Sequence, residues 1–228
     1  MKRATILLLS VLIMMIGLSV SAHAMLVPMG DGTIYDTDKQ LSWLQDAGAG
    51  GVKNWAAANT WVNQLNTIQN IYGVAGYAGR TNWRLPNADP GCGINYNCTN
   101  SEMGHLYYTE LGNLGYCDAS GNCPQAGWGL THTGSFTNLQ PDIYWSGTAV
   151  GGPSHAWAFD FTNGGQAYGA SEPSYYAWAV SPGCRPFTYG LVSGICSTPV
   201  PASGTVGLIV LGLAGVITYG MRLRKAPR

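Results

Sequence analysis

The sequence predicts an α+β domain in which two helices precede a mostly antiparallel sheet. Helical periodicity follows Asn54 and again Thr99, in the first half of the central part of the chain. The last third instead alternates aromatic and small residues between turn signals, a pattern typical of β-hairpins. Six cysteines lie in glycine-rich surroundings and predict disulfides that hold the loops together.

Two short strands and one amphipathic helix are expected first. Residues Thr33–Asp36 and Leu41–Leu44 are both strand candidates. Asn54 can cap a helix whose apolar residues recur three or four positions apart on one face: Trp55, Ala58, Val62 and Leu65.

The next feature is the segment Trp83-Arg84-Leu85-Pro86. Pro86 disfavours the helical region at Leu85, so the segment is expected to be extended. We expect Trp83 to enter the core and Arg84 to bind loop carbonyls or a carboxylate. Binding of an anionic ligand by Arg84 is the alternative.

The second helix and the late strands follow. Thr99 and Glu102 fit a capping box that opens a helix through Met103, Leu106, Tyr107 and Leu111. Asn163-Gly164 is a turn signal between two of the expected strands. The late strand candidates are Ile143–Ser146, Trp157–Phe161, Gln166–Tyr168 and Ala177–Val180.

The charge distribution argues against a polyanionic partner. Between Met25 and Pro199 the chain carries five basic residues against eleven acidic ones, a net charge of −6. Such a surface repels polyanions, which excludes nucleic acid as the expected partner. All eight tryptophans lie in the same interval, so the core is expected to be rich in aromatic residues.

The first 24 residues have the pattern of a secretory signal peptide. Lys2 and Arg3 precede an apolar run, and the run ends in small residues that fit cleavage between Ala24 and Met25. The expected partners are the Sec translocon and signal peptidase. An uncleaved anchor is the alternative.

The last thirty residues, 199–228, form a second targeting pattern. The short motif Pro199, Val200, Pro201, Ala202 precedes an uncharged run over 203–221 and a basic tail over 222–228. The run can span a bilayer, with the basic tail in the cytoplasm. A permanent anchor is one interpretation.

This order of motif, apolar helix and basic tail resembles the PEP-CTERM sorting signal, which exosortase recognises in Gram-negative bacteria. Val200 stands where the usual glutamate would be, as in a Val-Pro-Val-Pro-Ala type of the signal. The resemblance implies a protein that is anchored transiently in the inner membrane and then sorted to the cell surface or the extracellular space.

The even number of cysteines predicts disulfides in an oxidising compartment. Spacing suggests three pairs, one of 15 possible connectivities: Cys92–Cys98, Cys117–Cys123 and Cys184–Cys196. A zinc site is the rival interpretation, although the chain has no C-x-x-C motif and no paired histidine spacing.

No catalytic, cofactor or metal site is predicted. His105, His132 and His155 are scattered, and Glu102-x-x-His105 is only half of a di-iron motif. Residues 140–142, Gln-Pro-Asp, match a sugar-binding tripeptide of C-type lectins, but a turn before a strand is the preferred interpretation. The chain contains neither a G-x-S-x-G elbow nor a P-loop.

The succession of motifs resembles the bacterial Lcl C-terminal domain family over most of Thr33 to Pro186. Its signature residues here are Trp83, Arg84, Leu85, Pro86, Tyr144, Trp145, Ser146 and Trp157. The resemblance implies a C-type-lectin-like fold, related to formylglycine-generating enzymes, over an exported domain at 25–198. Ser181 stands where many members carry an arginine after Trp-Ala-Val.

The expected function is that of a non-enzymatic surface or extracellular-matrix protein with a lectin-like binding or structural domain. Two alternatives are an exported oxidoreductase of the formylglycine-generating type and a permanently membrane-anchored binding protein. The family's namesake is an adhesin associated with glycosaminoglycans, but sulfated chains need clustered basic residues, which a domain of net charge −6 lacks. Any ligand is therefore expected to be a neutral glycan or a matrix component.

Overall fold

The computed structural model describes residues 25–69 and 75–183 of the 228 residues. The expected signal peptide, the sorting signal and the pair Cys184–Cys196 lie outside the described residues. Within the described ranges, no helix has both the length and the apolar character needed to cross a membrane.

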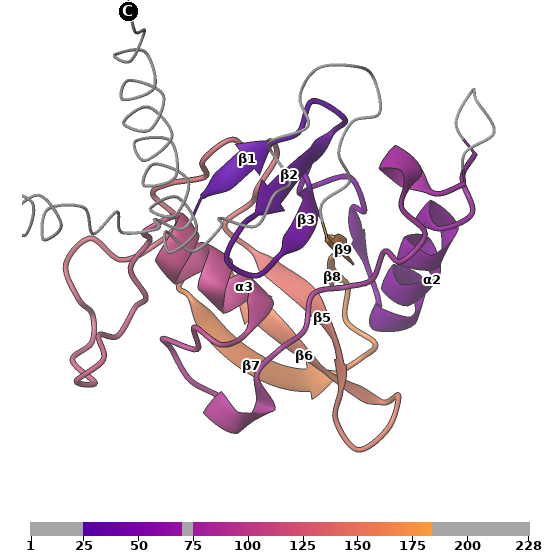
Figure 1. The fold of residues 1–228 in the computed structure, drawn as a ribbon. Coiled ribbons are helices and arrows are strands. Elements are labelled where there is room, and N and C mark those ends of the chain that lie inside the picture. The colour runs from indigo at the N-terminus through magenta and orange to yellow at the C-terminus, as the bar shows by residue number, and fades with distance from the viewer. Residues whose placement is uncertain (1–24, 70–74, 184–228) are drawn as a thin grey trace, which may run out of the picture. The chain divides into compact units, whose positions relative to one another are not determined.

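The strands form two sheets, shown in Figure 1. The first is antiparallel and has the order β1-β2-β3-β9, formed by β1 (Leu26–Pro28), β2 (Thr33–Asp36), β3 (Leu41–Leu44) and β9 (Val180–Pro182). The second has the order β4-β8-β5-β6-β7, formed by β4 (Val52–Lys53), β8 (Tyr175–Tyr176), β5 (Ile143–Ala149), β6 (His155–Asp160) and β7 (Gly165–Ala170). The α+β class is confirmed, although β5 and β8 pair in parallel and the late strands divide between the two sheets.

The predicted strand over Ala177–Val180 is wrong in its first three residues, because the chain passes there from one sheet to the other. The Ala177 amide donates to the Gly51 carbonyl beside β4, and the Ala179 carbonyl accepts from the Leu44 amide at the end of β3, each at 3.0 Å. Trp178 lies fully buried between these contacts and donates its indole N–H to the Leu44 carbonyl at 2.8 Å. The crossing residues therefore join the two sheets through one buried tryptophan.

The first predicted helix is confirmed as α2 (Trp55–Leu65). Asn54 caps it by accepting from the Ala57 amide at 2.9 Å. Its buried residues are Ala58, Val62 and Leu65, as the spacing predicts. Trp55 is half-buried and its indole donates to the Ser146 carbonyl of β5 at 2.7 Å, which holds α2 against the second sheet.

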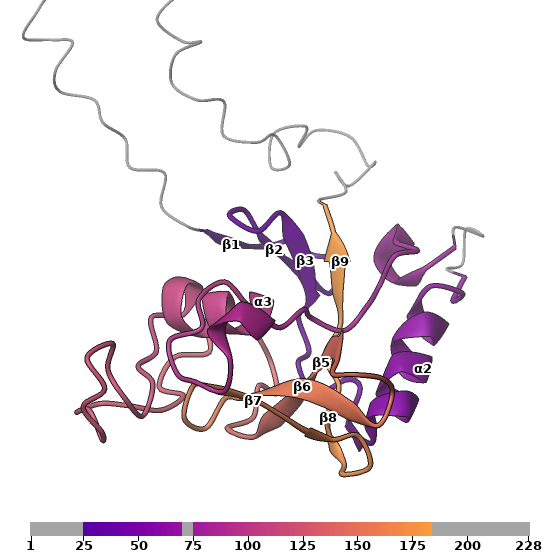
Figure 2. The same cartoon turned by 90° about the horizontal axis from the view of Figure 1, so that it is seen from below.

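The second helix is present, but its beginning and its geometry differ from the prediction. α3 (Glu102–His105) is capped by Ser101, which accepts from the Gly104 amide at 3.0 Å, and not by Thr99. The chain then continues as a π-helix, η3 (Leu106–Glu110). Figure 2 shows α3 near β1 and β2, on the side of the domain opposite to α2. The other helical turns are the 3₁₀ segments η1 (Tyr77–Gly79) and η2 (Pro90–Cys92).

The core is built from aromatic rings, as the composition predicts. The Trp178 ring lies 4.7 Å from Trp43 and 5.0 Å from Phe136, measured between ring centroids. Tyr144 and Phe161 extend this cluster, with centroids 5.1 Å apart. Edge-to-face and tilted pairs of this kind fill space densely and add to the free energy gained by burial.

The predicted hairpin between β6 and β7 is confirmed. Gly164 in its turn has φ +79°, and a Cβ there would collide with Tyr107 and with the Tyr108 hydroxyl. Glycine is therefore required both by the backbone conformation and by the close approach of η3. The hairpin sets the register of β7 against β6. Asp160 lies opposite Gly165 next to the turn, and His155 lies opposite Ala170 at the far end.

Candidate ligand groove

The Trp83-Arg84 signature is structural. Trp83 is 2% exposed and donates its indole N–H to the Tyr77 carbonyl at 3.0 Å. Arg84 binds the Glu102 carboxylate through two parallel hydrogen bonds of 2.6 and 2.7 Å, and it also donates to the Leu85 carbonyl. The predicted carboxylate partner is thus confirmed. The guanidinium already has an anion, which argues against an external anionic ligand.

The remaining signature residues lie in the interior. They are Leu85, Pro86, Tyr144, Trp145, Ser146 and Trp157, and all are buried. Ser181 is buried as well, and its hydroxyl donates to the Asn82 side chain at 2.7 Å. The structure therefore accommodates a serine at the position where many family members carry an arginine. The signature therefore identifies the fold of the domain and does not mark a ligand site.

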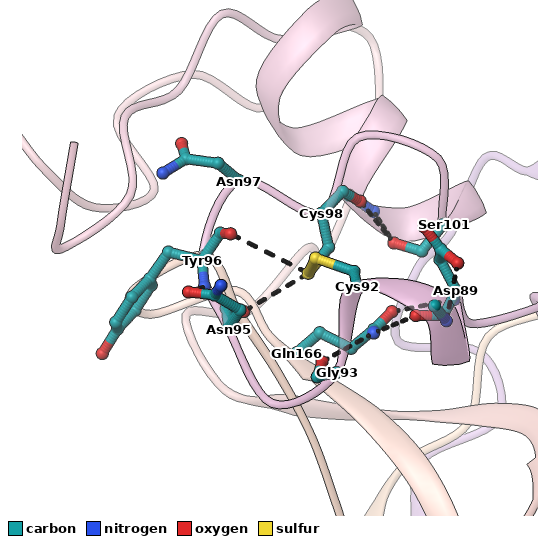
Figure 3. Close-up of a disulfide and its surroundings, with 12 residues drawn as sticks. Asp89, Cys92, Gly93, Asn95, Tyr96, Asn97, Cys98, Ser101 and Gln166 are labelled. Atoms are coloured by element: carbon teal, nitrogen blue, oxygen red, sulfur yellow. Dashed lines mark hydrogen bonds between the residues drawn. A yellow bond between two sulfur atoms is a disulfide. The ribbon is translucent and has the colours of Figure 1, made fainter. Parts of the chain in front are cut away.

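Two of the three predicted disulfides are confirmed, Cys92–Cys98 and Cys117–Cys123, and no cysteine of the described residues is free. Figure 3 shows the first of them. The carbonyl oxygens of Asn95 and Tyr96 lie 3.6 and 3.8 Å from the Cys98 sulfur, so the loop 92–98 folds tightly over its own disulfide. The Tyr96 ring points away from it.

Gln166 of β7 holds this disulfide loop against the second sheet. Its side-chain amide donates to the carbonyls of Asp89 and Gly93 at 2.8 and 3.2 Å, and its side-chain oxygen accepts from the Asp89 amide at 3.0 Å (Figure 3). Asn95 also exchanges two backbone hydrogen bonds with Gln166, of 3.1 and 2.8 Å. The loop 92–98 is therefore an added edge of the sheet, placed beside β7.

A hollow of about 330 Å³ lies along this edge, and we call it the ligand groove. Alternate residues of β6 and β7 place small side chains on one face of the sheet, and these residues form its floor: Ala158, Gly165, Ala167 and Gly169. Larger residues rise on its two sides, Ile94 and Tyr96 from the disulfide loop and Ile143 and Tyr175 from β5 and β8. The hollow exists because β6 and β7 carry small side chains on this face, up to Asp160 at its end.

Tyr168 also touches the groove but belongs to the opposite face of β7. It pairs with Trp157 across the hairpin, and their ring centroids are 4.9 Å apart. Its ring is 45% exposed. Tyr168 is therefore exposed while it covers Trp157, whereas Tyr96 in the disulfide loop is half-buried.

The polar groups at the end of the groove are acidic or neutral. Asp160 accepts from the Thr162 amide at 2.8 Å and from the Asn163 side chain at 2.6 Å, so its carboxylate is held in place by the hairpin turn. Asn95 adds an exposed amide side chain. The lining contains no lysine and no arginine. The groove can therefore accept a flat apolar surface between two phenol rings and hydrogen-bond to neighbouring hydroxyls, while repelling an anion.

Residues 140–142 lie in the bend that precedes β5. The Gln140 amide donates to the Tyr144 hydroxyl at 2.9 Å, and the Asp142 side chain accepts from the Ile143 amide at 2.7 Å. Both contacts stabilise the bend, in agreement with the interpretation of this tripeptide as a turn.

A second group of polar residues was missed by the sequence analysis. Glu102 and His105 do not act together, because Glu102 binds Arg84. His105 instead lies 3.2 Å from Glu110, measured between Nε2 and Oε1, and Asp36 of β2 completes a cluster whose ligand atoms lie within 4.8 Å of one another. Burial raises the pKa of Asp36, and the nearby Glu110 carboxylate adds to the rise, against backbone N–H donors that lower it. Within the described part of the chain, these three are the residues that could hold a metal ion.

The histidines at 132 and 155 are not part of any such group. Both are exposed, and each has a neighbouring hydroxyl as its side-chain contact, Thr131 for His132 and Ser154 for His155. The signal that could have identified the cluster is weak in the sequence, since Asp36 is distant and Glu110 follows His105 at a spacing of five.

Comparison with known families matches residues 32–181 to the Lcl C-terminal domain. No curated protein and no solved structure matches the chain.

Proposed function

Because the chain belongs to the Lcl C-terminal domain family, we propose that it is an exported, non-enzymatic binding protein whose ligand groove takes a neutral carbohydrate. The observation that carries this proposal is the composition of the groove. Tyr96 and Tyr175 line it together with a floor of alanine and glycine, and Asp160 and the amides of Asn95 and Asn163 lie beside them. Sugar rings present a flat apolar face and a rim of hydroxyls, and the groove offers partners for both.

Charge favours a neutral ligand over a sulfated one. The exported part carries a net charge of −6, and the acid Asp160 lies in the groove itself. The two arginines of the described residues are already in ion pairs, Arg80 with Asp31 and Arg84 with Glu102. Binding of a sulfated polysaccharide would need clustered free cations and would weaken steeply with salt.

The C-type-lectin-like fold is part of the same proposal. Two helices that flank sheets, together with two loops closed by disulfides, support it, as does the family to which the chain belongs. The carbohydrate would lie on the sheet edge formed by β7 and the loop 92–98, and not at the bend of residues 140–142.

Export and sorting rest on the two ends of the chain. A signal peptide over 1–24 and a PEP-CTERM signal over 199–228 would deliver the domain to the cell surface or the extracellular space through exosortase. Intact mass measurement of the protein recovered from a Gram-negative host that carries an exosortase tests this directly. We expect a mature chain that begins at Met25 and has lost the apolar run 203–221. A mass that retains residues 199–228 would instead show a permanent anchor.

An oxidoreductase of the formylglycine-generating type would need reactive thiols. The four cysteines of the described domain are joined in disulfides, which supports a binding role. Thiol titration of the unfolded, unreduced chain separates the two functions, because the binding protein is expected to show no free thiol. Two or more titrating thiols would favour the enzyme.

The proposed ligand class is tested with the full-length chain in detergent on a glycan array and on immobilised heparin. We expect retention on a set of neutral glycans, with little change between low and physiological ionic strength. Retention on heparin that is released by salt, with no binding to any neutral glycan, would overturn the proposal.

A further inference from the structure

We propose that Asp36, His105 and Glu110 form a binding site for a divalent transition-metal ion of the Zn²⁺ type. The site is separate from the ligand groove and is formed by the end of β2 and by the helical segment α3–η3. Two carboxylates and one imidazole are a donor set that suits Zn²⁺, whereas Ca²⁺ and Mg²⁺ prefer sites made of oxygen alone.

The first argument is an unpaired oxygen on a fully buried side chain. Asp36 is 0% exposed, and its Oδ1 accepts from the amides of Asp38 and Lys39 at 3.0 and 2.8 Å. Its other oxygen, Oδ2, is buried and has no hydrogen-bond partner. A buried carboxylate oxygen without a partner is costly, and such atoms are rare in folded proteins. A bound cation is the partner that this oxygen lacks.

The negative charge of the two buried carboxylates also favours a bound cation. Glu110 has a side chain that is 1% exposed, and no lysine or arginine of the described residues forms an ion pair with it or with Asp36. Two carboxylates are thus buried beside one imidazole, with no lysine or arginine paired to either of them. Burial of uncompensated charge is strongly unfavourable, and a divalent cation would neutralise both carboxylates at once.

The third argument is the local geometry of the helix. In an α-helix, residues five apart point about 140° away from each other around the axis. Here the chain is π-helical after His105, as the hydrogen bond from the Leu111 amide to the Leu106 carbonyl shows at 2.9 Å. A π-turn brings residues five apart onto one side, which places His105 Nε2 3.2 Å from Glu110 Oε1. Two ligands of a tetrahedral Zn²⁺ ion are about 3.3 Å apart for metal bonds of about 2.0–2.1 Å, so this pair already has the spacing of two such ligands.

One of the three ligands, Glu110, borders a hollow. The hollow has a volume of about 590 Å³ and is also lined by Leu26 of β1 and by residues 131–135. With three ligands from the protein, a water molecule from this hollow can supply a further one. The bound ion would join β2 of the first sheet to the α3–η3 segment.

The test is a Zn²⁺ titration of the full-length chain after chelator treatment and alkylation of any free thiol. We expect one ion per chain by calorimetry and a melting temperature that rises with the concentration of free Zn²⁺. Asp36→Asn and His105→Gln should each weaken binding at least tenfold. Their matched controls, the exposed residues in Asp38→Asn and His155→Gln, should change it less than twofold. A wild-type chain that shows no saturable binding, or binding that survives both Asp36→Asn and His105→Gln, would overturn the proposal.

A second measurement does not depend on whether the variants fold. X-ray absorption of the Zn²⁺-loaded wild-type chain should show nitrogen and oxygen ligands with a single imidazole and no sulfur. A shell that contains sulfur or several imidazoles would place the ion elsewhere and would contradict the assignment. If instead the wild-type chain binds no Zn²⁺ and Asp36→Asn is more stable than wild type at neutral pH, the two carboxylates share a proton and no metal is needed.

Discussion

The two faces of the sheet at β5, β6 and β7 carry different side chains and have different exposure. On the inner face, Tyr144, Trp157 and Phe159 pack into the aromatic core with almost no exposed area. On the outer face, β6 and β7 carry the alanines and glycines that form the floor of the ligand groove, whereas β5 carries Ile143 and Trp145. Since side chains alternate along a strand, one stretch of sequence supplies both the stability of the fold and an open surface for a ligand.

Substitutions on the inner face should reduce the free energy of unfolding the most. Phe159 is buried and its ring contacts Tyr107 and Phe161 at centroid distances of 5.6 and 5.0 Å. Phe159→Ala removes these contacts and leaves a cavity, so we expect a loss of about 3–5 kcal/mol in the free energy of unfolding. Such a loss is comparable to the whole stability of a small domain. Urea unfolding followed by tryptophan fluorescence measures it, and a loss below about 1 kcal/mol would show that this face is not the core.

Trp83→Ala should have a similar effect, although Trp83 lies outside the two faces. Its indole is buried and bonded to the Tyr77 carbonyl, so truncation should cost about 3–5 kcal/mol. Trp128→Ala, which removes an exposed tryptophan, is the control and should change stability little. A soluble Trp83→Ala chain that melts cooperatively near the wild-type temperature would reassign this residue to the surface.

Gln166 connects the two faces, because it is buried on the inner side yet holds the loop that forms one side of the groove. Gln166→Ala removes three hydrogen bonds to Asp89 and Gly93 and leaves buried backbone groups without partners. We expect a stability loss of about 1–3 kcal/mol, together with weaker ligand binding as Tyr96 loses its support. Gln140→Ala, which removes one side-chain contact outside the groove, is the control. Unchanged hydrogen-exchange protection of the loop 92–98 in Gln166→Ala would contradict this role.

The inner face should also make the domain sensitive to alkali. Burial raises the pKa of Tyr144 from its ordinary value of 10.0 to about 12, against the Gln140 amide, which lowers it. Because the neutral phenol is favoured in the folded state, the contribution of Tyr144 is fully present below pH 10 and is lost as the pH rises towards 12. The loss is about 1–3 kcal/mol for a shift of this size.

Urea unfolding of the wild type and of Tyr144→Phe between pH 8 and pH 12 measures this loss. The phenylalanine variant cannot ionise at this position, so its stability should fall less steeply above pH 10. Parallel curves for the two proteins would show that the Tyr144 phenol does not contribute to the alkaline loss.

The strands β2, β3, β5, β6 and β7 and the first helix could be predicted from the sequence because their signals are local, whereas the short strands β1, β4 and β8 were not predicted. Each signal acts within a few residues. Asn54 precedes the apolar periodicity of a helix, Asn163-Gly164 marks a turn, and aromatic and small residues alternate along β6. The path of residues 177–179 could not be predicted in this way. Their backbone partners are Gly51 and Leu44, which are far away in the sequence, and a strand pattern does not reveal which sheet it joins.

The sites were harder to predict than the fold for the same reason. Cysteine spacing predicted the disulfide loop, but its place beside β7 depends on the pairing of Asn95 with Gln166. The spacing of Thr99 and Glu102 predicted a capping box. In the structure the Glu102 carboxylate binds Arg84 instead, and Ser101 caps the helix. No metal ligand could be predicted from the sequence, since a spacing of five between His105 and Glu110 aligns side chains in a π-helix and not in an α-helix.

One pair of substitutions in β7 can decide whether the outer face of the sheet is the binding surface. Ala167 and Ala170 are both exposed alanines, three positions apart, and therefore lie on opposite faces of the strand. Leucine at 167 would fill the floor of the groove, whereas leucine at 170 would extend from the other face. Each substitution should change the free energy of unfolding by about 0.5 kcal/mol or less.

The measurement is the affinity of both variants for the neutral glycan that the wild-type chain retains on an array. We expect Ala167→Leu to weaken binding at least tenfold and Ala170→Leu to stay within twofold of the wild type. Equal affinity in the two variants, with wild-type folding in both, would show that the carbohydrate does not bind in this groove.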